Sequence, residues 1–232
     1  NCPGGLHVLG RTARNKITET SMDSQSHTNR DPVVTDHLQE SGEDSTSRHY
    51  VTGGQALIDS IYNEGVRVIF GLPGVQLYHA VIPILDYPDL RFITTRHEQA
   101  TTYMADGYAR ASGKVGVAMV VPGPGLQNAS AGITNAYSAS AKVLVISGQI
   151  SRDAISKNIG VLHEINDQLE IVRPITKWQA RVLTAKHIAP AVQKSFYQLR
   201  TGRPRPVEIE MPPEALSEFT EISAYRSAEI HS

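Results

Sequence analysis

From residue 51 onward, short apolar runs alternate with amphipathic segments, and this alternation limits the possible folds more than any other feature. The run at residues 115–121 contains no charge, which is typical of a strand covered on both faces. The alternation predicts an α/β fold, a single open, mainly parallel six-stranded sheet with helices on both faces. The predicted strands are residues 66–70, 91–94, 115–121, 143–147, 178–183 and 206–211, and the predicted helices are 54–63, 76–85, 98–111, 126–138, 165–172 and 185–199.

The first 50 residues differ sharply in composition from the rest of the chain. They are rich in Ser, Thr, Asp, Glu, Arg and His, contain no Phe or Trp and show no sustained hydrophobic period. Such a segment buries too little apolar area to offset the entropy lost on ordering. We therefore expect residues 1–50 to be a disordered tail, or sequence upstream of the true start, and the folded domain to begin at residue 51.

The charge balance and the single cysteine exclude several classes of protein. The chain has 22 basic and 23 acidic residues, whereas a nucleic-acid or membrane-surface binder needs a clustered positive field. The longest charge-free stretch, residues 115–141, contains a Pro-Gly-Pro-Gly loop and polar side chains, so we expect no membrane span. Cys2 alone forms no internal disulfide and no cysteine-based zinc site, which predicts a reducing, cytoplasmic location.

A parallel sheet places its ligand site at one defined edge. In open α/β sheets, ligands bind at the carboxyl ends of the strands, where the chain turns into the N-termini of helices. The predicted strands therefore single out four loops, at residues 71–75, 95–98, 122–125 and 148–152.

The second of these loops ends in Arg96, His97 and Glu98 at the predicted start of a helix. A helix N-terminus stabilises a carboxylate charge by about 0.3–1 kcal/mol, whereas burial in a cleft raises the pKa of a carboxyl group. A glutamate under both influences can donate and accept a proton near neutral pH. Acidic residues are common in the first turn of any helix, so the residues alone favour a structural role for Glu98.

The third loop, residues 122–125, has the sequence Pro-Gly-Pro-Gly before a predicted helix. It lacks the Lys and Ser/Thr of a Walker loop and the third Gly of the dinucleotide fingerprint, which disfavours ATP and NAD as ligands. Its glycines allow the backbone to approach a flat ligand and its prolines stiffen the turn. A tight corner without any ligand would use the same residues.

Other polar groups in the chain do not form a recognisable site. His163, Glu164 and Asp167 lack the spacing of metal ligands, so we expect no metal site. Ser147 and Ser151 come without a visible base, which leaves a hydrolase triad unsupported. On the residues alone, the sequence indicates an α/β ligand-binding domain with one notable glutamate.

A series of short motifs follows in order along residues 51–216. Each is weak alone, but their shared order and spacing are specific. They are Phe70-Gly71-Leu72-Pro73-Gly74, Arg96-His97-Glu98-Gln99, Ala105-Asp106-Gly107-Tyr108-Ala109-Arg110, Gly123-Pro124-Gly125 with Asn128, Ser147-Gly148-Gln149, Ile175-Thr176-Lys177 and Gly202-Arg203-Pro204. In these motifs the chain resembles the N-terminal, pyrimidine-binding domain of thiamine-diphosphate enzymes, most closely the acetolactate synthase large-subunit group.

The resemblance implies roles for individual residues. In the family, the glutamate that matches Glu98 hydrogen-bonds the pyrimidine ring of thiamine diphosphate, and the activated cofactor decarboxylates a 2-keto acid. Glu98 is then the catalytic residue. The other cofactor-binding positions implied by the resemblance are Gly74, Val75, Gly123, Pro124, Gly125 and Asn128, and the positions implied to border the substrate channel are Gln76, Gln149 and Lys177.

The resemblance also implies further domains and partners. It points to a lyase or transferase of branched-chain amino acid biosynthesis, a homodimer or tetramer with the active site between subunits. A C-terminal domain would hold the diphosphate and Mg²⁺ and a central domain FAD, and residues 217–232 would begin the linker to the central domain. The chain contains no Gly-Asp-Gly…Asn motif for the diphosphate, so we expect it to be a fragment that is inactive alone.

Departures from the family pattern leave alternatives open. Val75 and Gln76 stand where acetolactate synthases usually have a second glycine, and Lys142 replaces a proline of the family. One alternative is another thiamine-diphosphate enzyme, such as a 2-keto-acid decarboxylase, a glyoxylate carboligase or a sulfoacetaldehyde-type enzyme. The other is a stand-alone dimerisation or binding module without chemistry.

Overall fold

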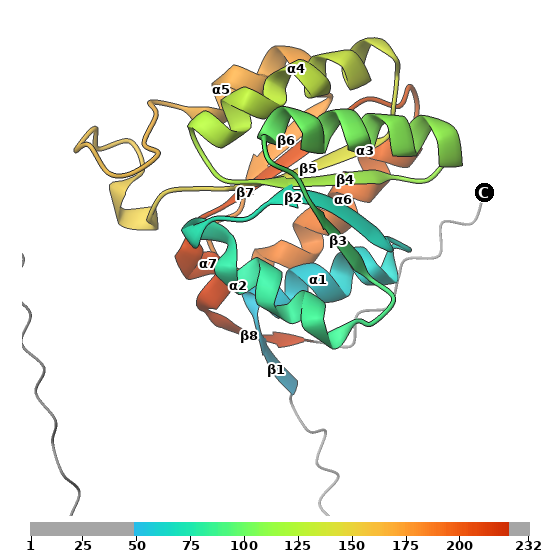
Figure 1. The fold of residues 1–232 in the computed structure, drawn as a ribbon. Coiled ribbons are helices and arrows are strands. Elements are labelled where there is room, and N and C mark those ends of the chain that lie inside the picture. The colour runs from blue at the N-terminus through green and yellow to red at the C-terminus, as the bar shows by residue number, and fades with distance from the viewer. Residues whose placement is uncertain (1–48, 223–232) are drawn as a thin grey trace, which may run out of the picture. The chain divides into compact units, whose positions relative to one another are not determined.

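The computed structural model describes residues 49–222 (Figure 1). The predicted disordered tail therefore lies outside the described residues except at positions 49 and 50, and the predicted linker lies within them only up to residue 222. The strands are β1 (His49–Thr52), β2 (Val68–Leu72), β3 (Arg91–Thr94), β4 (Gly116–Val120), β5 (Val143–Gly148), β6 (Trp178–Arg181), β7 (Val207–Met211) and β8 (Phe219–Ile222). The α-helices are α1 (Gly53–Asn63), α2 (Tyr78–Val81), α3 (Glu98–Ser112), α4 (Pro124–Ser138), α5 (Gln168–Val172), α6 (Ile188–Arg200) and α7 (Pro213–Ser217).

Six of the strands form one parallel sheet in the order β3-β2-β4-β5-β7-β6. In its register, Ile69 of β2 lies between Phe92 of β3 and Val117 of β4. The chain moves outward from β2 to β3 and then crosses to the other side of β2 to form β4. At such a switch point the loops that follow the two strands diverge and leave room for a ligand. The sheet confirms the predicted fold class and places this point between β2 and β4.

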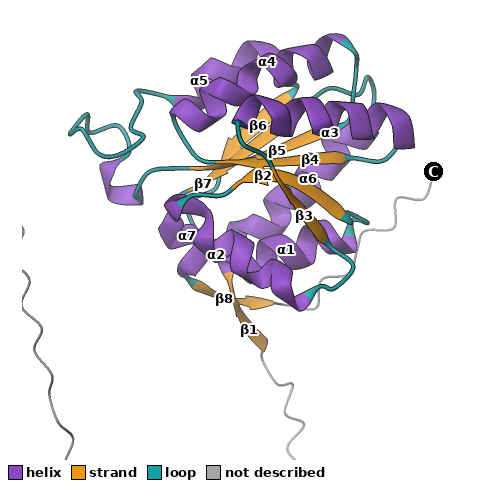
Figure 2. Ribbon diagram, in the orientation of Figure 1, coloured by secondary structure: helices purple, strands orange, loops and turns teal. Residues whose placement is uncertain are grey.

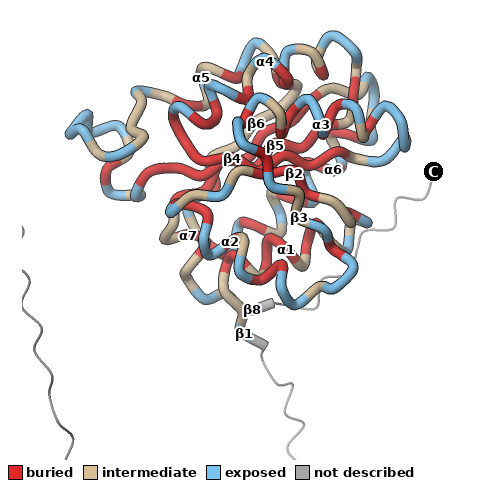
Figure 3. Tube along the Cα trace, viewed as in Figure 1, coloured by how far each residue is buried: buried red, intermediate tan, exposed pale blue. Residues whose placement is uncertain are grey.

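Helices cover both faces of the sheet (Figure 2), with α1, α2, α6 and α7 on one face and α3, α4 and α5 on the other. Side chains alternate between the faces along each strand. In β4, Val117 and Met119 enter the core beneath α1 and α6, while Ala118 and Val120 enter the core beneath α3 and α4. The central strands β4, β5 and β7 are consequently buried (Figure 3), which explains the charge-free run of the sequence at β4.

Helices α3 and α4 pack closely because small residues line their contact. The hydroxyl of Thr102 in α3 donates a hydrogen bond to the carbonyl of Ala129 in α4 at 2.8 Å. Gly132, one turn further along α4, lies directly against Thr102 and the backbone of Tyr103. The close packing fixes the N-terminal ends of the two helices relative to each other.

Two features of the fold differ from the predictions. The predicted helix at residues 76–85 is broken into the 3₁₀ turn Val75–Leu77, the four-residue helix α2 and the 3₁₀ turn Ile82–Asp86, which contains Pro83. Strands β1 and β8 form an antiparallel pair that was not predicted, with Thr52 opposite Phe219. Residues 49, 50 and 219–222 were expected outside the folded domain, yet this pair includes them.

The contact between α3 and α4 gives a first prediction. A Gly132→Ala substitution places a methyl group into Thr102 Oγ1 and 2.8 Å from the backbone nitrogen of Tyr103. Overpacking of this kind costs about 1–3 kcal/mol, so we expect a lower free energy of unfolding in urea. Gly107→Ala on α3 is the matched control, because a methyl group there meets no atom within 4 Å. It should raise stability by up to about 1 kcal/mol through helix propensity, and equal effects of the two variants would contradict the packing argument.

Candidate functional site

Glu98 is the first residue of α3 and lies at the carboxyl edge of the sheet, beyond the end of β3. His97 caps the helix, and its Nδ1 accepts a hydrogen bond from the backbone N–H of Gln99 at 3.2 Å. Glu98 is only 9% exposed. The partial positive charge of a helix N-terminus stabilises a carboxylate at this position by about 0.3–1 kcal/mol, so the fold holds a negative group inside a largely buried cluster.

The carboxylate of Glu98 has one oxygen engaged and one available. Asn128, in the second turn of α4, donates a hydrogen bond from Nδ2 to Glu98 Oε2 at 2.9 Å. Within residues 49–222, Oε1 receives no hydrogen bond. A side chain at Gly125 would begin 3.5 Å from Oε1, so the glycine keeps the space beside this oxygen open. The hydrogen bond from Asn128 therefore fixes the Glu98 carboxylate and leaves Oε1 available to a neighbouring group.

The side chain of Val121, directly after β4, packs between the loop that follows β2 and the start of α4. A Cβ atom at Gly74 would lie 2.5 Å from Val121 Cγ1, and a Cβ atom at Gly125 would lie 2.6 Å from Val121 Cγ2. Both glycines thus pack their backbone directly against this side chain. The loop after β5 joins them, because a Cβ atom at Gly148 would lie 2.9 Å from Pro122 Cδ. The structure therefore brings together the four loops that the sequence singled out.

The Pro-Gly-Pro-Gly loop has a backbone that only glycine adopts easily. Gly123 caps α4 with φ of 57° and ψ of −113°, and a side chain there would overlap the carbonyl oxygen of His163. Pro124 occupies the first position of α4, where its missing N–H leaves no intrahelical hydrogen bond unmade. The loop is consequently a close-fitting corner, and the backbone of Gly125 faces Glu98.

The predicted substrate-channel residues do not all lie together. Gln76 is buried next to Gly148, and its side-chain oxygen has no partner among the described residues. Val75, beside it, is 56% exposed. Lys177 precedes β6 and so lies at the opposite, amino edge of the sheet, where its ammonium donates to the carbonyl oxygens of Gln198 at 2.7 Å and Thr201 at 2.5 Å. Lys177 therefore caps the end of α6 and does not join the Glu98 cluster.

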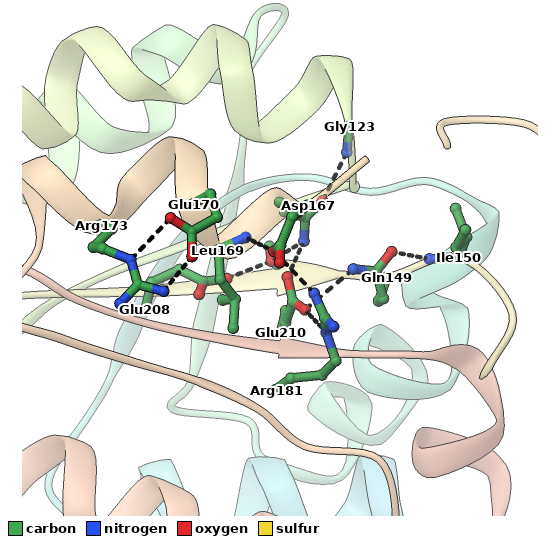
Figure 4. A network of polar contacts seen from close by, with 12 residues as sticks. Gly123, Gln149, Ile150, Asp167, Leu169, Glu170, Arg173, Arg181, Glu208 and Glu210 are labelled. Carbon is green, nitrogen blue, oxygen red and sulfur yellow. Dashed lines mark hydrogen bonds and ion pairs between the residues drawn. The ribbon is translucent and has the colours of Figure 1, made fainter. Parts of the chain in front are cut away.

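A buried polar network that the sequence did not predict lies beneath these loops (Figure 4). Glu210 of β7 is fully buried and accepts hydrogen bonds from Arg181, from Gln149 Nε2 at 3.1 Å and from Gln168 Nε2 at 2.8 Å. Gln149, predicted to face substrate, thus has its amide bound inside the domain. Two glutamates in a strand between two parallel neighbours must be buried, which is the signal by which this network could have been found.

Glu208 of β7 is the other carboxyl group of this network. Ser147 donates a hydrogen bond to Glu208 Oε1 at 2.6 Å, while Oε2 is buried without a partner among the described residues. Burial, reinforced by the neighbouring charge of Glu210, raises the pKa of Glu208 well above its ordinary value. Burial at this position therefore favours the uncharged form of Glu208.

Of the remaining sequence candidates, Glu164 and Ser151 have hydrogen-bond partners, whereas Nδ1 of His163 is buried without one among the described residues. Glu164 accepts hydrogen bonds from the backbone N–H groups of Gly160 at 2.5 Å and Val161 at 3.1 Å, and so orders its own loop. Ser151 donates to Glu214 at 2.6 Å. Within residues 49–222, no three His, Cys, Asp or Glu side chains converge as a metal site. No helix of this described part has the length and apolar character to cross a membrane.

Comparison with known proteins identifies the family. Residues 51–171 match the family model described as "Thiamine pyrophosphate enzyme, N-terminal TPP binding domain". The chain belongs to the thiamine pyrophosphate enzyme family. The match covers all four loops at the carboxyl edge of the sheet, so residues 51–171 correspond to the N-terminal domain of these enzymes that binds thiamine pyrophosphate (thiamine diphosphate).

Curated relatives of this thiamine pyrophosphate enzyme domain include decarboxylases, synthases and lyases. The chain is 39% identical over 170 residues to the probable 2-ketoarginine decarboxylase AruI of Pseudomonas aeruginosa, covering 72% of this chain and 30% of that protein. It is 38% identical over 173 residues to the acetolactate synthase large subunit of Lactococcus lactis, covering 74% and 30%. It is 34% identical over 177 residues to 2-hydroxyacyl-CoA lyase 2 of Xenopus laevis, covering 76% and 26%. The aligned part thus spans under a third of each relative.

The raised pKa of Glu208 predicts a pH-dependent stability. Above about pH 4.3 the unfolded chain releases this proton, whereas the folded domain keeps it, so the free energy of unfolding falls as pH rises toward the folded-state pKa. Glu208→Gln removes this dependence. We expect urea unfolding between pH 5 and 8 to shift in favour of the variant by up to about 1.4 kcal/mol per pH unit. Glu170→Gln at the exposed surface is the control, and a pH-independent difference for Glu208→Gln would contradict the prediction.

Proposed function

We propose that this chain supplies the thiamine-diphosphate-activating half of a 2-keto-acid decarboxylase or carboligase of the acetolactate synthase type. The observation that carries the proposal is the Glu98–Asn128 pair, in which a mostly buried carboxylate keeps one oxygen free beside a glycine. Glu98 Oε1 would bind the ring nitrogen of the cofactor pyrimidine and hold a proton there. When bound, thiamine diphosphate supplies the electron sink for decarboxylation.

The residues around Glu98 suit a flat, partly apolar ring. Gly74 and Gly125 pack their backbone against Val121, and Gly125 places no side chain beside Glu98 Oε1. Asn128 donates to Oε2 and so fixes the plane of the carboxylate. Two helix N-termini, of α3 and α4, begin at this cluster and favour negative charge on it. These features support assigning the cofactor pyrimidine to this place.

We further propose that the active site is completed by other parts of the protein. The diphosphate, with Mg²⁺, would be anchored by another domain across a subunit boundary, in a homodimer or tetramer located in the cytoplasm, and FAD would bind outside these residues. Val75 and Gln76 would face the substrate next to Glu98. We do not extend a substrate role to Lys177, whose ammonium is already bound by the end of α6.

Val75 favours a second candidate within the same family. Its exposed isopropyl group occupies a position where acetolactate synthases usually carry a glycine. A side chain of this size would narrow the space for a second keto acid in the active site. This favours a simple decarboxylase, which needs no second substrate in the site. Assays of the full-length protein with pyruvate, phenylglyoxylate, glyoxylate, sulfoacetaldehyde and 2-ketoarginine distinguish a carboligase from a decarboxylase.

The proposed role of Glu98 predicts a specific defect. In the full-length protein, Glu98→Gln removes the group that shares a proton with the pyrimidine nitrogen. We expect exchange of the cofactor C2 proton with D₂O, followed by NMR, to slow by about 10²–10⁴-fold. Glu170→Gln makes the same change of charge at an exposed position and should leave exchange unaltered. Equal exchange rates in wild type and Glu98→Gln would remove Glu98 from the mechanism.

A further inference from the structure

The Pro-Gly-Pro-Gly loop is tied to the interior of the domain by one side chain. The backbone N–H of Gly123 donates a hydrogen bond to Oε1 of Gln168 at 2.8 Å (Figure 4). Gln168, the first residue of α5, is 1% exposed. Because Gly123 is the N-cap of α4, this bond anchors the backbone at the point where the loop becomes the helix that carries Asn128.

The other end of the Gln168 amide contacts only acceptors. Nε2 donates to Ser147 Oγ at 3.0 Å, to the carbonyl oxygen of Gly148 at 2.9 Å and to Glu210 Oε2 at 2.8 Å. Gly123 N–H can only donate, and the carbonyl of Gly148 can only accept. The side chain at position 168 must therefore accept a hydrogen bond on one side and donate one on the other. An amide does both at any pH, whereas a carboxyl group does so only when protonated.

The position of Gln168 is set by buried neighbours on three strands. Glu210 of β7 is held by Arg181 of β6, and Ser147 of β5 donates its own hydrogen to Glu208 at 2.6 Å. None of these hydrogen bonds includes Glu98 or Asn128. The network is bonded to the 122–125 loop through the backbone N–H of Gly123 and to the end of β5 through the carbonyl oxygen of Gly148.

We propose that Gln168 is a positioning residue that sets the 122–125 loop and, through α4, the contact between Asn128 and Glu98. The inference rests on the proposed function, because it assigns the loop to the cofactor. A displacement of Gly123 moves Gly125 and Asn128 with it, since all three belong to the same N-terminal two turns of α4. Displacements of about 1 Å in positioning groups suffice to impair catalysis strongly.

The substitution Gln168→Glu tests the requirement for an amide, because a carboxyl group at position 168 can both accept from Gly123 and donate to Glu210 only while it is protonated. A protonated carboxyl group can accept from Gly123 and donate to Glu210, whereas an ionised one has no donor and faces the Glu210 carboxylate. The titratable or charged groups packed around position 168 are Glu208, Glu210, Arg181, Asp167, His163, Glu170 and Arg173. Only the new carboxyl differs between the variant and wild type.

The experiment follows the Gly123 amide in the 232-residue chain by NMR hydrogen exchange between pH 5 and 8.5. After correction for the intrinsic exchange rate, we expect wild type to stay protected throughout. Gln168→Glu should match wild type at the acid end and lose at least tenfold protection at the alkaline end, while the amide of Val145 in the core stays protected. Gln193→Glu, at an exposed position of α6, is the matched control and should follow wild type.

Two outcomes would overturn the proposal. The first is equal protection of Gly123 in wild type and Gln168→Glu at every pH. The second is an equal loss at Gly123 and Val145, which would mean that the whole domain opens. This readout needs no cofactor, so it is independent of the role of Glu98.

The link to the cofactor is tested in the full-length protein. We expect thiamine-diphosphate binding by Gln168→Glu to weaken at least tenfold, relative to Gln193→Glu, as the pH rises from 6 to 8. A response at Gly123 without any change in binding would overturn the positioning role, while the Glu98→Gln exchange rate would still decide the proposed function.

Discussion

All six strands of the main sheet run in the same direction, and the site depends on this constraint. Parallel strands deliver every strand-to-helix loop to one edge of the sheet. Gly74, Glu98, Gly125 and Gln149 therefore meet although they come from four different strand–helix connections. The loops on either side of the switch between β2 and β4 meet at Val121, while the loops further from the switch close over buried polar groups.

The electrostatics of Glu98 come from the backbone. Its charge is favoured by two helix N-termini and by an amide hydrogen bond from Asn128, and no Lys or Arg side chain pairs with it within residues 49–222. A salt bridge would occupy the carboxylate oxygens and hold the group ionised. Dipoles and one neutral donor stabilise the carboxylate while leaving an oxygen available, which is the condition for sharing a proton with a bound ring.

The sequence predicted the six-stranded sheet well and the details of its periphery poorly. Strands such as β4 and β5 were found because buried strands are short apolar runs between turns. The β1–β8 pair was missed because its strands are far apart in the chain and half exposed, so neither has a periodic signal. The helix expected at residues 76–85 has the right apolar spacing, but Pro83 and the exposed Leu85 belong to a 3₁₀ turn.

For the site, the sequence indicated the loops but not what holds them. The resemblance of the ordered motifs to thiamine-diphosphate enzymes singled out Glu98, Gly125 and Asn128. Lys177 directly precedes the strand predicted at residues 178–183, and in a parallel sheet this position lies at the amino edge, a signal that the family resemblance did not use. Gln168 was missed because its function depends on a partner 45 residues away in the chain, at Gly123.

The presence of buried carboxyl groups in β7 is better explained by the orientation they impose on Gln168 than by a contribution to the stability of the domain. Removing a carboxylate and an arginine from water costs several kcal/mol per ion, and replacing such a pair by apolar residues is often neutral or stabilising. Glu210 and Arg181 therefore contribute little net stability where Val or Ile would pack as in β5. What apolar residues cannot do is orient an amide. With Glu210 in place, the Gln168 amide has only one favourable orientation, and that orientation directs its oxygen to Gly123.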